Sequence, residues 1–467
     1  MQIHLNYGRG TVPLNLPDEA AVTVIRKPAM PVLPDPVAGV IKALLTPVES
    51  PSLVSFVRCE TPGADGWLAP PSPSAIGVPR SLAELARGRA TACIAICDIT
   101  RPVPNHLFLR PMIETLLQAG VPASGITVLV ATGLHRPNEG AELAELVGDP
   151  WVLETVKVEN HFARNDAEHV NLGRTRTRGT VVRLDRRFVE ADLRIATGLV
   201  EPHFMAGYSG GRKVIAPGLA HAETITTFHS GRFMADVNAA NCNFEGNPLH
   251  EEQLEIVRML GGALALNTVL DEHRRLSFVN FGEILASHAE AVQVARQFCE
   301  VRLPRRFHTV VTSAAGYPLD KTYYQTVKGM VGAMEILEPG GDLIIASECS
   351  EGMGSAEFLA SQQRLVRLGA DTFLSSLLSK SHAAIDEWQT QMQLKPLAIG
   401  NVHLYSDKLP AAHQSATGVA MAPSLDEAVR KSLARSPDKA VAVIPEGPYV
   451  VPFFASGPTA QPSLAMS

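Results

Sequence analysis

The sequence predicts an α/β protein of two domains, each with a mostly parallel sheet covered by helices. Three observations lead to this prediction. The 467 residues are too many for one ordinary hydrophobic core. From residue 81 onward, apolar strand-like runs alternate with helix-like segments, as in sheets whose strands are joined by helices. The strand-like runs are also apolar throughout, which is typical of strands buried on both faces.

The first predicted domain covers residues 1–302. It begins with strands, a Pro-rich connection and a short helix near 37–45, and the Pro-rich stretch 61–80 predicts an extended surface connection. Strands and helices then alternate. The expected strands are 90–98, 126–133 and 192–198, and the expected helices are 81–88, 107–120, 141–148, 250–261 and 282–300.

The second predicted domain covers residues 303–435. It should hold strands near 303–318, 340–354 and 401–407 and a helix over 324–337. The apolar run 440–454 is again strand-like, so we expect 436–467 to return to the first domain. The last residues, 455–467, are expected to be frayed.

Composition excludes several classes of function. The formal net charge of −6 argues against binding nucleic acid through a global positive field. The sequence contains no run of eighteen apolar residues and no signal-peptide layout at its start, so we expect neither a membrane span nor export. The six cysteines show no CxxC spacing, which favours a reducing cytoplasm over a disulfide framework.

Polar residues follow three of the predicted strands. CDITRPVPNH places Asp98 and Arg101 after the first, and the echoing runs ATGLH and ATGLVEPH place His135 and His203 after two others. Parallel sheets bind ligands at the carboxyl ends of their strands, so we expect both histidines to face one cleft between the domains as an acid/base pair. Asp98 and Arg101 would grip a ligand there or merely pair with each other.

The stretch EPHFMAGYSGGRKVIAPG, residues 201–218, places glycines before Lys213. GYSGGRKV is close to a nucleotide-binding phosphate loop, but Arg212 and Val214 replace a required glycine and hydroxyl, so a nucleoside triphosphatase is rejected. From these residues alone, a cradle for a phosphate-like group and a solvated turn remain equally open.

Other candidates lie further along the chain. His229 would be a helix-surface residue or one ligand of a metal that an organic cofactor carries. Gln325 and Lys328 share a helix face beside Tyr324, and this face would be a carboxylate site or an ordinary polar surface. Trp388 would line a pocket or fill a core.

A set of motifs occurs in order along the chain: DITRP, TGLHRP, EPHF-AG-SGGRK, FHS, GYPLD with YQTVKGM, EWQ and IPEGPYVVP. In these motifs the chain resembles the nickel-pincer-nucleotide-dependent lactate racemase family. The resemblance implies a racemase or epimerase that inverts C2 of a 2-hydroxy acid by hydride transfer to and from the cofactor. The cofactor would be a nickel-pincer nucleotide, a pyridinium bis-thiocarboxylate mononucleotide bound covalently to Lys213. Cofactor-biosynthesis proteins would be its partners.

The resemblance also implies a role for each site residue. His135 and His203 would be the acid/base pair, and His229 the nickel ligand. Cofactor-binding residues would be Asp98, Ile99, Thr100, Arg101, Lys213 and Tyr324, and substrate contacts would be Arg101, Gln325, Lys328 and Trp388.

Two departures leave the substrate open. Ile99 stands where the lactate enzymes tend to have His, and the chain is longer around 61–80. Lactate, malate, an aryl-lactate and a sugar acid are all compatible with the sequence. The alternatives in function are a nicotinamide-dependent dehydrogenase, for which the G-x-G-x-x-G fingerprint is missing, and a non-catalytic protein that binds the pincer nucleotide.

Overall fold

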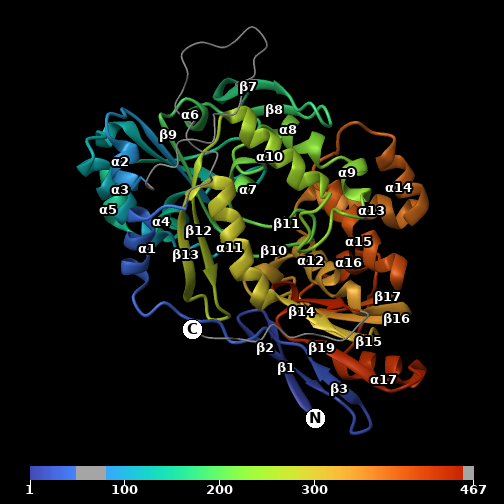
Figure 1. Ribbon diagram of the computed structural model, residues 1–467. Helices are drawn as coiled ribbons and strands as arrows, with labels where there is room; N and C mark the ends of the chain where they lie inside the picture. Colours follow the sequence, from blue (N-terminus) through green and yellow to red (C-terminus); the bar gives the residue numbers. More distant parts are fainter. Residues whose placement is uncertain (49–79, 456–467) are drawn as a thin grey trace.

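The computed structural model describes residues 1–48 and 80–455, and the predicted Pro-rich connection and the chain end lie outside these ranges. The described chain contains two six-stranded sheets, one in each half of the molecule (Figure 1). The first has the order β13-β12-β9-β4-β5-β6 and is parallel except for β13. Its strands are β4 (Ala92–Cys97), β5 (Ile126–Ala131), β6 (Lys157–Asn160), β9 (Leu193–Leu199), β12 (Leu264–Leu270) and β13 (Leu276–Glu283).

Helices cover both faces of the first sheet, because alternate residues of its apolar strands point to opposite sides. Ile94 and Val128 pack into a cluster with the helices on one face, whereas Cys93 and Leu129 belong to the cluster on the other. The first face holds α1 (Pro36–Leu45), α2 (Leu82–Ala86), α3 (Asn105–Gln118), α4 (Gly140–Val147) and α5 (Pro150–Thr155). Helices of the second face include α6 (Arg186–Val189), α7 (Arg212–Ile215), α8 (Ala222–Phe228), α9 (Gly231–Ala235), α10 (Pro248–Leu260) and the start of α11 (Ile284–Cys299).

The second sheet is parallel throughout, with the order β18-β17-β16-β15-β19-β3. Its strands are β3 (Ala21–Val24), β15 (Phe307–Ser313), β16 (Leu337–Ala346), β17 (Asn401–Tyr405), β18 (Ala420–Met421) and β19 (Ala440–Ile444). The helices of this half are α12 (Tyr323–Ala333), α13 (Ala356–Leu368), α14 (Ala370–Leu378), α15 (Glu387–Ile399), α16 (Ala411–Gln414) and α17 (Leu425–Arg435). The predicted fold class is thereby confirmed.

The two ends of the chain differ from the expected division. We placed residues 1–302 and 436–467 together, but β3 and β19 pair with each other in the second sheet. The hairpin of β1 (Gln2–Tyr7) and β2 (Gly10–Asn15) packs with α17 on a face of this same sheet (Figure 1). The reason is burial, because Leu5 and Leu14 on the hairpin cover Val311 and Val441 of the sheet. Within the described residues, the short pairing of β14 (Glu300–Leu303) with β20 (Val451–Phe454) runs back to the end of the first half.

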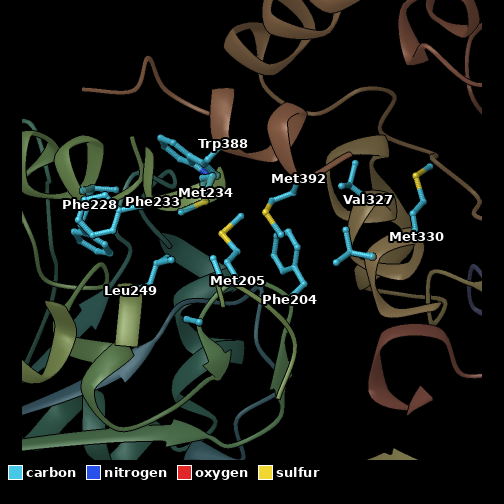
Figure 2. Packing of buried hydrophobic residues seen from close by; sticks show 14 of the residues in the cluster. Phe204, Met205, Phe228, Phe233, Met234, Leu249, Val327, Met330, Trp388 and Met392 are labelled. Atoms are coloured by element: carbon cyan, nitrogen blue, oxygen red, sulfur yellow. The ribbon is translucent and has the colours of Figure 1, made fainter. Parts of the chain in front are cut away.

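One apolar cluster connects the halves. It extends from α7, α8 and α10 under the first sheet to α12, α13 and α15 on the second. Figure 2 shows Phe204 and Met205 of the first half beside Met392 of α15, with Trp388 one turn earlier on that helix. Short hairpins, β7 (His169–Arg174) with β8 (Val181–Asp185) and β10 (Pro202–His203) with β11 (Gly207–Tyr208), complete the described sheets. None of the helices in these described ranges is long and apolar enough to cross a membrane.

Candidate active site

Three strand ends bring the predicted polar residues together. Strands β9, β4 and β5 are adjacent and parallel, so their carboxyl ends lie at one edge of the sheet. Asp98 follows β4, His135 follows β5 and His203 follows β9. All three residues line one cavity of about 620 Å³.

The cavity lies between the two halves, since both contribute to its lining. Most of the predicted site residues are in it: Asp98, Thr100, Arg101, His135, His203, Lys213, His229, Tyr324, Gln325, Lys328 and Trp388. Ile99 is placed differently, because its side chain packs against the apolar cluster on the α3 face of the sheet. Described residues also line a second cavity of about 370 Å³, and they include Glu201, Arg274 and Tyr449.

Asp98 and His135 form a close pair. Asp98 is buried, and its Oδ2 accepts a hydrogen bond from Nδ1 of His135 at 2.5 Å, while Oδ1 accepts one from the Thr100 hydroxyl at 2.6 Å. The negative charge of Asp98 raises the pKa of His135 above its ordinary 6.5. Burial alone would raise the pKa of Asp98, but His135 and Thr100 together hold it below 3.8. With Nδ1 donating to Asp98, Nε2 of a neutral His135 is free to accept a proton.

His203 has the complementary arrangement. Its Nδ1 accepts hydrogen bonds from the backbone N–H groups of Met205 at 3.3 Å and Ala206 at 3.2 Å, so the ring proton of the neutral form is on Nε2. Burial, followed by the nearby charges of Lys213 and Lys328, lowers the pKa of His203 well below 6.5. The cavity therefore contains one imidazole arranged to accept a proton and one that presents an N–H.

Lys213 is an amine with a low proton affinity. Burial, and then the positive charges of Arg101 and Arg212, lower the pKa of Lys213 from 10.5 to about 7. At a pKa of about 7, the Lys213 amine is neutral in about half of the protein molecules at pH 7. A neutral amine is the nucleophilic form. Of the two interpretations of this stretch, the solvated turn is wrong, because Arg212 is 1% exposed and Lys213 lines the cavity.

His229 is buried rather than on a helix surface. It caps the end of α8, and its Nδ1 donates to the Ile225 carbonyl oxygen at 2.9 Å, which leaves the Nε2 lone pair free. Burial, with a contribution from Lys213, lowers the pKa of His229 to about 3, so the ring is neutral. A neutral imidazole with its second nitrogen hydrogen-bonded is the form that binds a metal. In the described part of the chain, no three His, Cys, Asp or Glu side chains are grouped to hold a metal ion.

Cationic groups gather near the histidines. Arg101 does not pair with Asp98, as one interpretation of its loop had it, but with Glu201 at 3.1 Å. Lys328 lies on α12 with its Nζ 6.0 Å from the ring centroid of Phe204, and burial and Arg101 lower its pKa. Gln325, on the same helix, has a buried Oε1 with no hydrogen-bond partner among the described residues. Two cations and an unpartnered amide are suited to an anionic ligand with a hydroxyl group.

Trp388 and Tyr324 contribute aromatic side chains to the cavity lining. Trp388 is 6% exposed, and its ring centroid lies 4.9 Å from that of His229. Its indole N–H donates to the hydroxyl of Tyr324 at 3.2 Å. Trp388 thus lines the pocket and belongs to the core at once, because α15 and α12 pack against each other.

The glycines before Lys213 serve the loop's own packing. Gly210 and Gly211 have φ values of 75° and 48°, in the left-handed region that favours glycine. A Cβ on Gly210 would lie 2.8 Å from Val200, and one on Gly211 would lie 2.7 Å from the ring of His288. These contacts are with protein rather than with the cavity, so they explain the glycines without a bound group.

Sequence reasoning missed two residues of this cavity, Asp386 and Ser355, and also the ion-pair partner of Arg101, which is Glu201. Glu201 was visible as the acidic residue two positions before His203, whereas Asp386 and Ser355 carry no local signal that separates them from surface residues. Asp386 and Ser355 line the cavity with Tyr324, and their hydroxyl and carboxylate are hydrogen-bonded at 2.5 Å.

Comparison with known proteins identifies the family. Models described as the lactate racemase N-terminal domain and the lactate racemase C-terminal domain match residues 75–241 and 305–451. The chain belongs to the lactate racemase family. The lactate racemase of Lactiplantibacillus plantarum is 31% identical over 373 residues, which cover 79% of this chain and 87% of the relative. The lactate racemase of Thermoanaerobacterium thermosaccharolyticum is 30% identical over 382 residues, or 80% and 87% of the two chains.

Solved structures agree with this assignment. The lactate racemase apoprotein from Thermoanaerobacterium thermosaccharolyticum superposes with a TM-score of 0.83 and 26% identity, covering 97% of this chain and all of that one. A protein from Thermotoga maritima shares the fold, with a TM-score of 0.62 and 16% identity over 80% of this chain and 96% of its own. The comparisons support a racemase, and hence an isomerase, as the enzyme class of this chain.

Proposed function

We propose that this member of the lactate racemase family inverts C2 of a 2-hydroxy acid, using His135 and His203 as the acid/base pair and a nickel-pincer nucleotide held by Lys213 and His229. The observation that carries the proposal is the pair of imidazoles in one cavity, one arranged to accept a proton and one presenting an N–H. Inversion needs both capacities around one carbon.

The residues present fit the cofactor. Lys213 offers a partly neutral amine for a covalent bond, and His229 offers one free imidazole nitrogen to a metal whose other ligands the nucleotide supplies. Both side chains line the cavity that contains the histidine pair. When bound, the group would take up a hydride from C2 and return it, which is chemistry that protein side chains do not provide.

The chain's own residues would handle the charge and the protons. Arg101 and Lys328 would hold the carboxylate, so that only the C2 group changes its orientation. His135 would accept the hydroxyl proton at Nε2, and Asp98 would stabilise the resulting imidazolium. His203 would donate a hydrogen bond from Nε2–H to the same oxygen from the other side. His135 would return the same proton to the oxygen as the product forms, so that the proton balance closes for either enantiomer.

The rival functions lack a comparable observation. A nicotinamide-dependent dehydrogenase would not need a buried, partly neutral lysine beside a buried histidine, and a purely binding protein would not need two imidazoles in complementary states. The cofactor-biosynthesis partners and the cytoplasmic location stay predictions from the sequence.

The test is co-expression with cofactor-biosynthesis proteins, followed by intact-mass measurement and chiral chromatography of single-enantiomer 2-hydroxy acids. We expect wild type and the control Lys431→Ala to gain the cofactor's mass and to invert at least one acid, since Lys431 is 66% exposed. Lys213→Ala should gain no mass. His135→Ala and His203→Ala should gain mass but lose inversion. A wild type that gains mass and inverts no acid of the panel would refute the proposed function.

A further inference from the structure

A carboxylate from the second half of the molecule lies in the cavity and has no role so far. Asp386 precedes α15 and has a left-handed φ of 64°, which is unusual for a residue other than glycine. An aspartate in this position ordinarily caps its helix. Within the described chain, the Asp386 side chain makes no capping hydrogen bond and instead accepts one from the Ser355 hydroxyl at 2.5 Å.

The surroundings of Asp386 place it beside the acid/base pair. Asp386, Ser355, Tyr324 and His135 all line the same cavity. Burial raises the pKa of Asp386, whereas Ser355, His135 and Tyr324 oppose that rise. The charge of Asp386 in turn contributes to the raised pKa of His135. The hydrogen bond from Ser355 leaves part of the acceptor capacity of this carboxylate free, since a carboxylate has about four lone-pair sites.

The position of Tyr324 relates this carboxylate to the substrate. Tyr324 is adjacent on α12 to Gln325, and Lys328 follows one turn later. Arg101, Lys328 and the two histidines line the same cavity as Tyr324, Ser355 and Asp386. An acid whose carboxylate is held by the two cations and whose C2 is at the histidines therefore leaves Tyr324, Ser355 and Asp386 for its groups beyond C2.

The chemistry of this corner selects among acids. An ionised carboxylate only accepts hydrogen bonds, so it favours the binding of groups that donate them, such as hydroxyls. A second carboxylate, as in malate, would face a like charge. An alkyl or aryl group would remove water from Asp386 and leave its free sites unpaired.

We propose that Asp386, Ser355 and Tyr324 form a hydroxyl-binding subsite, and that the substrate is a 2-hydroxy acid with further hydroxyl groups beyond C2, of the sugar-acid class. The inference rests on the proposed racemase function. The ribose of a bound nucleotide carries the same hydroxyl chemistry, so the experiment must separate the two sources.

The experiment compares cofactor-loaded wild type, Asp386→Asn and the matched control Asp371→Asn, which removes an exposed carboxylate of α14 outside the cavity. The probes are single-enantiomer lactate and malate and the aldonic acids D-gluconate and D-galactonate, followed by chiral chromatography. Wild type should have the highest kcat/KM for an aldonic acid. Asp386→Asn should lower that value on the order of 10-fold or more, mainly through KM, because a hydrogen bond to a charged group is lost. It should leave lactate within about 2-fold of wild type, and the control should change neither.

Two further readouts separate the outcomes. Intact mass should show equal cofactor loading in wild type and Asp386→Asn, and calorimetry should show weaker binding of the aldonic acid to the unloaded variant than to unloaded wild type. Loss of loading in the variant would assign the hydroxyls to the nucleotide and overturn the substrate class. An equal fall in kcat/KM for every acid would also overturn the substrate class, since it would mean that Asp386 acts only through the pKa of His135. If wild type inverts lactate or malate better than both aldonic acids, the substrate class is wrong while the racemase function stands.

Discussion

The protonation of Lys213 can be measured without any cofactor. Its amine lies in the cavity, where burial and two cationic neighbours lower the pKa from 10.5 to about 7. At pH 7 about one half of the Lys213 side chains would then be neutral, against about 3 in 10,000 of ordinary lysine side chains. The fraction of Lys213 that can react with an acylating reagent should thus be about 1,500 times larger than at a pKa of 10.5.

The assay is competitive acetylation of the purified protein at a series of pH values, with the labelled peptides quantified by mass spectrometry. Lys431 is the internal control, because it is 66% exposed on α17. Labelling of Lys213 should rise with a midpoint near pH 7, and Arg101→Gln should move this midpoint to higher pH by removing one of the cations. A midpoint for Lys213 that coincides with that of Lys431 would refute the reasoning on burial and charge.

Two other predictions concern the histidine pair and the glycine loop. Asp98→Asn removes the charge that raises the pKa of His135. Because His135 must be neutral to accept a proton, the acidic limb of the pH–rate profile should move toward lower pH, and an unmoved limb would show that another group controls it. Gly211→Ala should lower the free energy of unfolding by roughly 2–3 kcal/mol in urea titrations, because its φ of 48° and a Cβ 2.7 Å from His288 are both unfavourable. Gly10→Ala, with open space around it, should change little, and an equally stable Gly211→Ala would contradict the packing argument.

Much of the site followed from local sequence because its residues lie at the ends of buried strands. Asp98, His135 and His203 each come shortly after an apolar run, and parallel pairing alone brings such positions to one edge. Their hydrogen-bond partners did not follow. Asp98 was expected to grip a ligand or to pair with Arg101, but the structure pairs it with His135, because the order of β9, β4 and β5 decides which strand ends are neighbours.

The rest depended on contacts between distant segments. Asn15 of β2 donates hydrogen bonds from its backbone and side-chain N–H groups to the carboxylate of Asp426 on α17. No local sequence pattern predicts this pairing. Asp386 lines the cavity and has a left-handed backbone conformation, which the sequence DEWQ does not predict. The family resemblance indicated the order of the motifs, whereas the structure was needed to find Ser355 and Asp386 in the cavity and Glu201 as the partner of Arg101.

The most direct test of the account follows the hydrogen on C2. A single-enantiomer 2-hydroxy acid deuterated at C2 is incubated with cofactor-loaded protein in ordinary water, and the inverted product is isolated by chiral chromatography and weighed by mass spectrometry. If His135 and His203 exchange only the hydroxyl proton while C2 gives up and regains a hydride, the product keeps its deuterium. Product that has lost the deuterium to water would show that a histidine removes the C2 hydrogen as a proton, and would contradict the proposed division of roles.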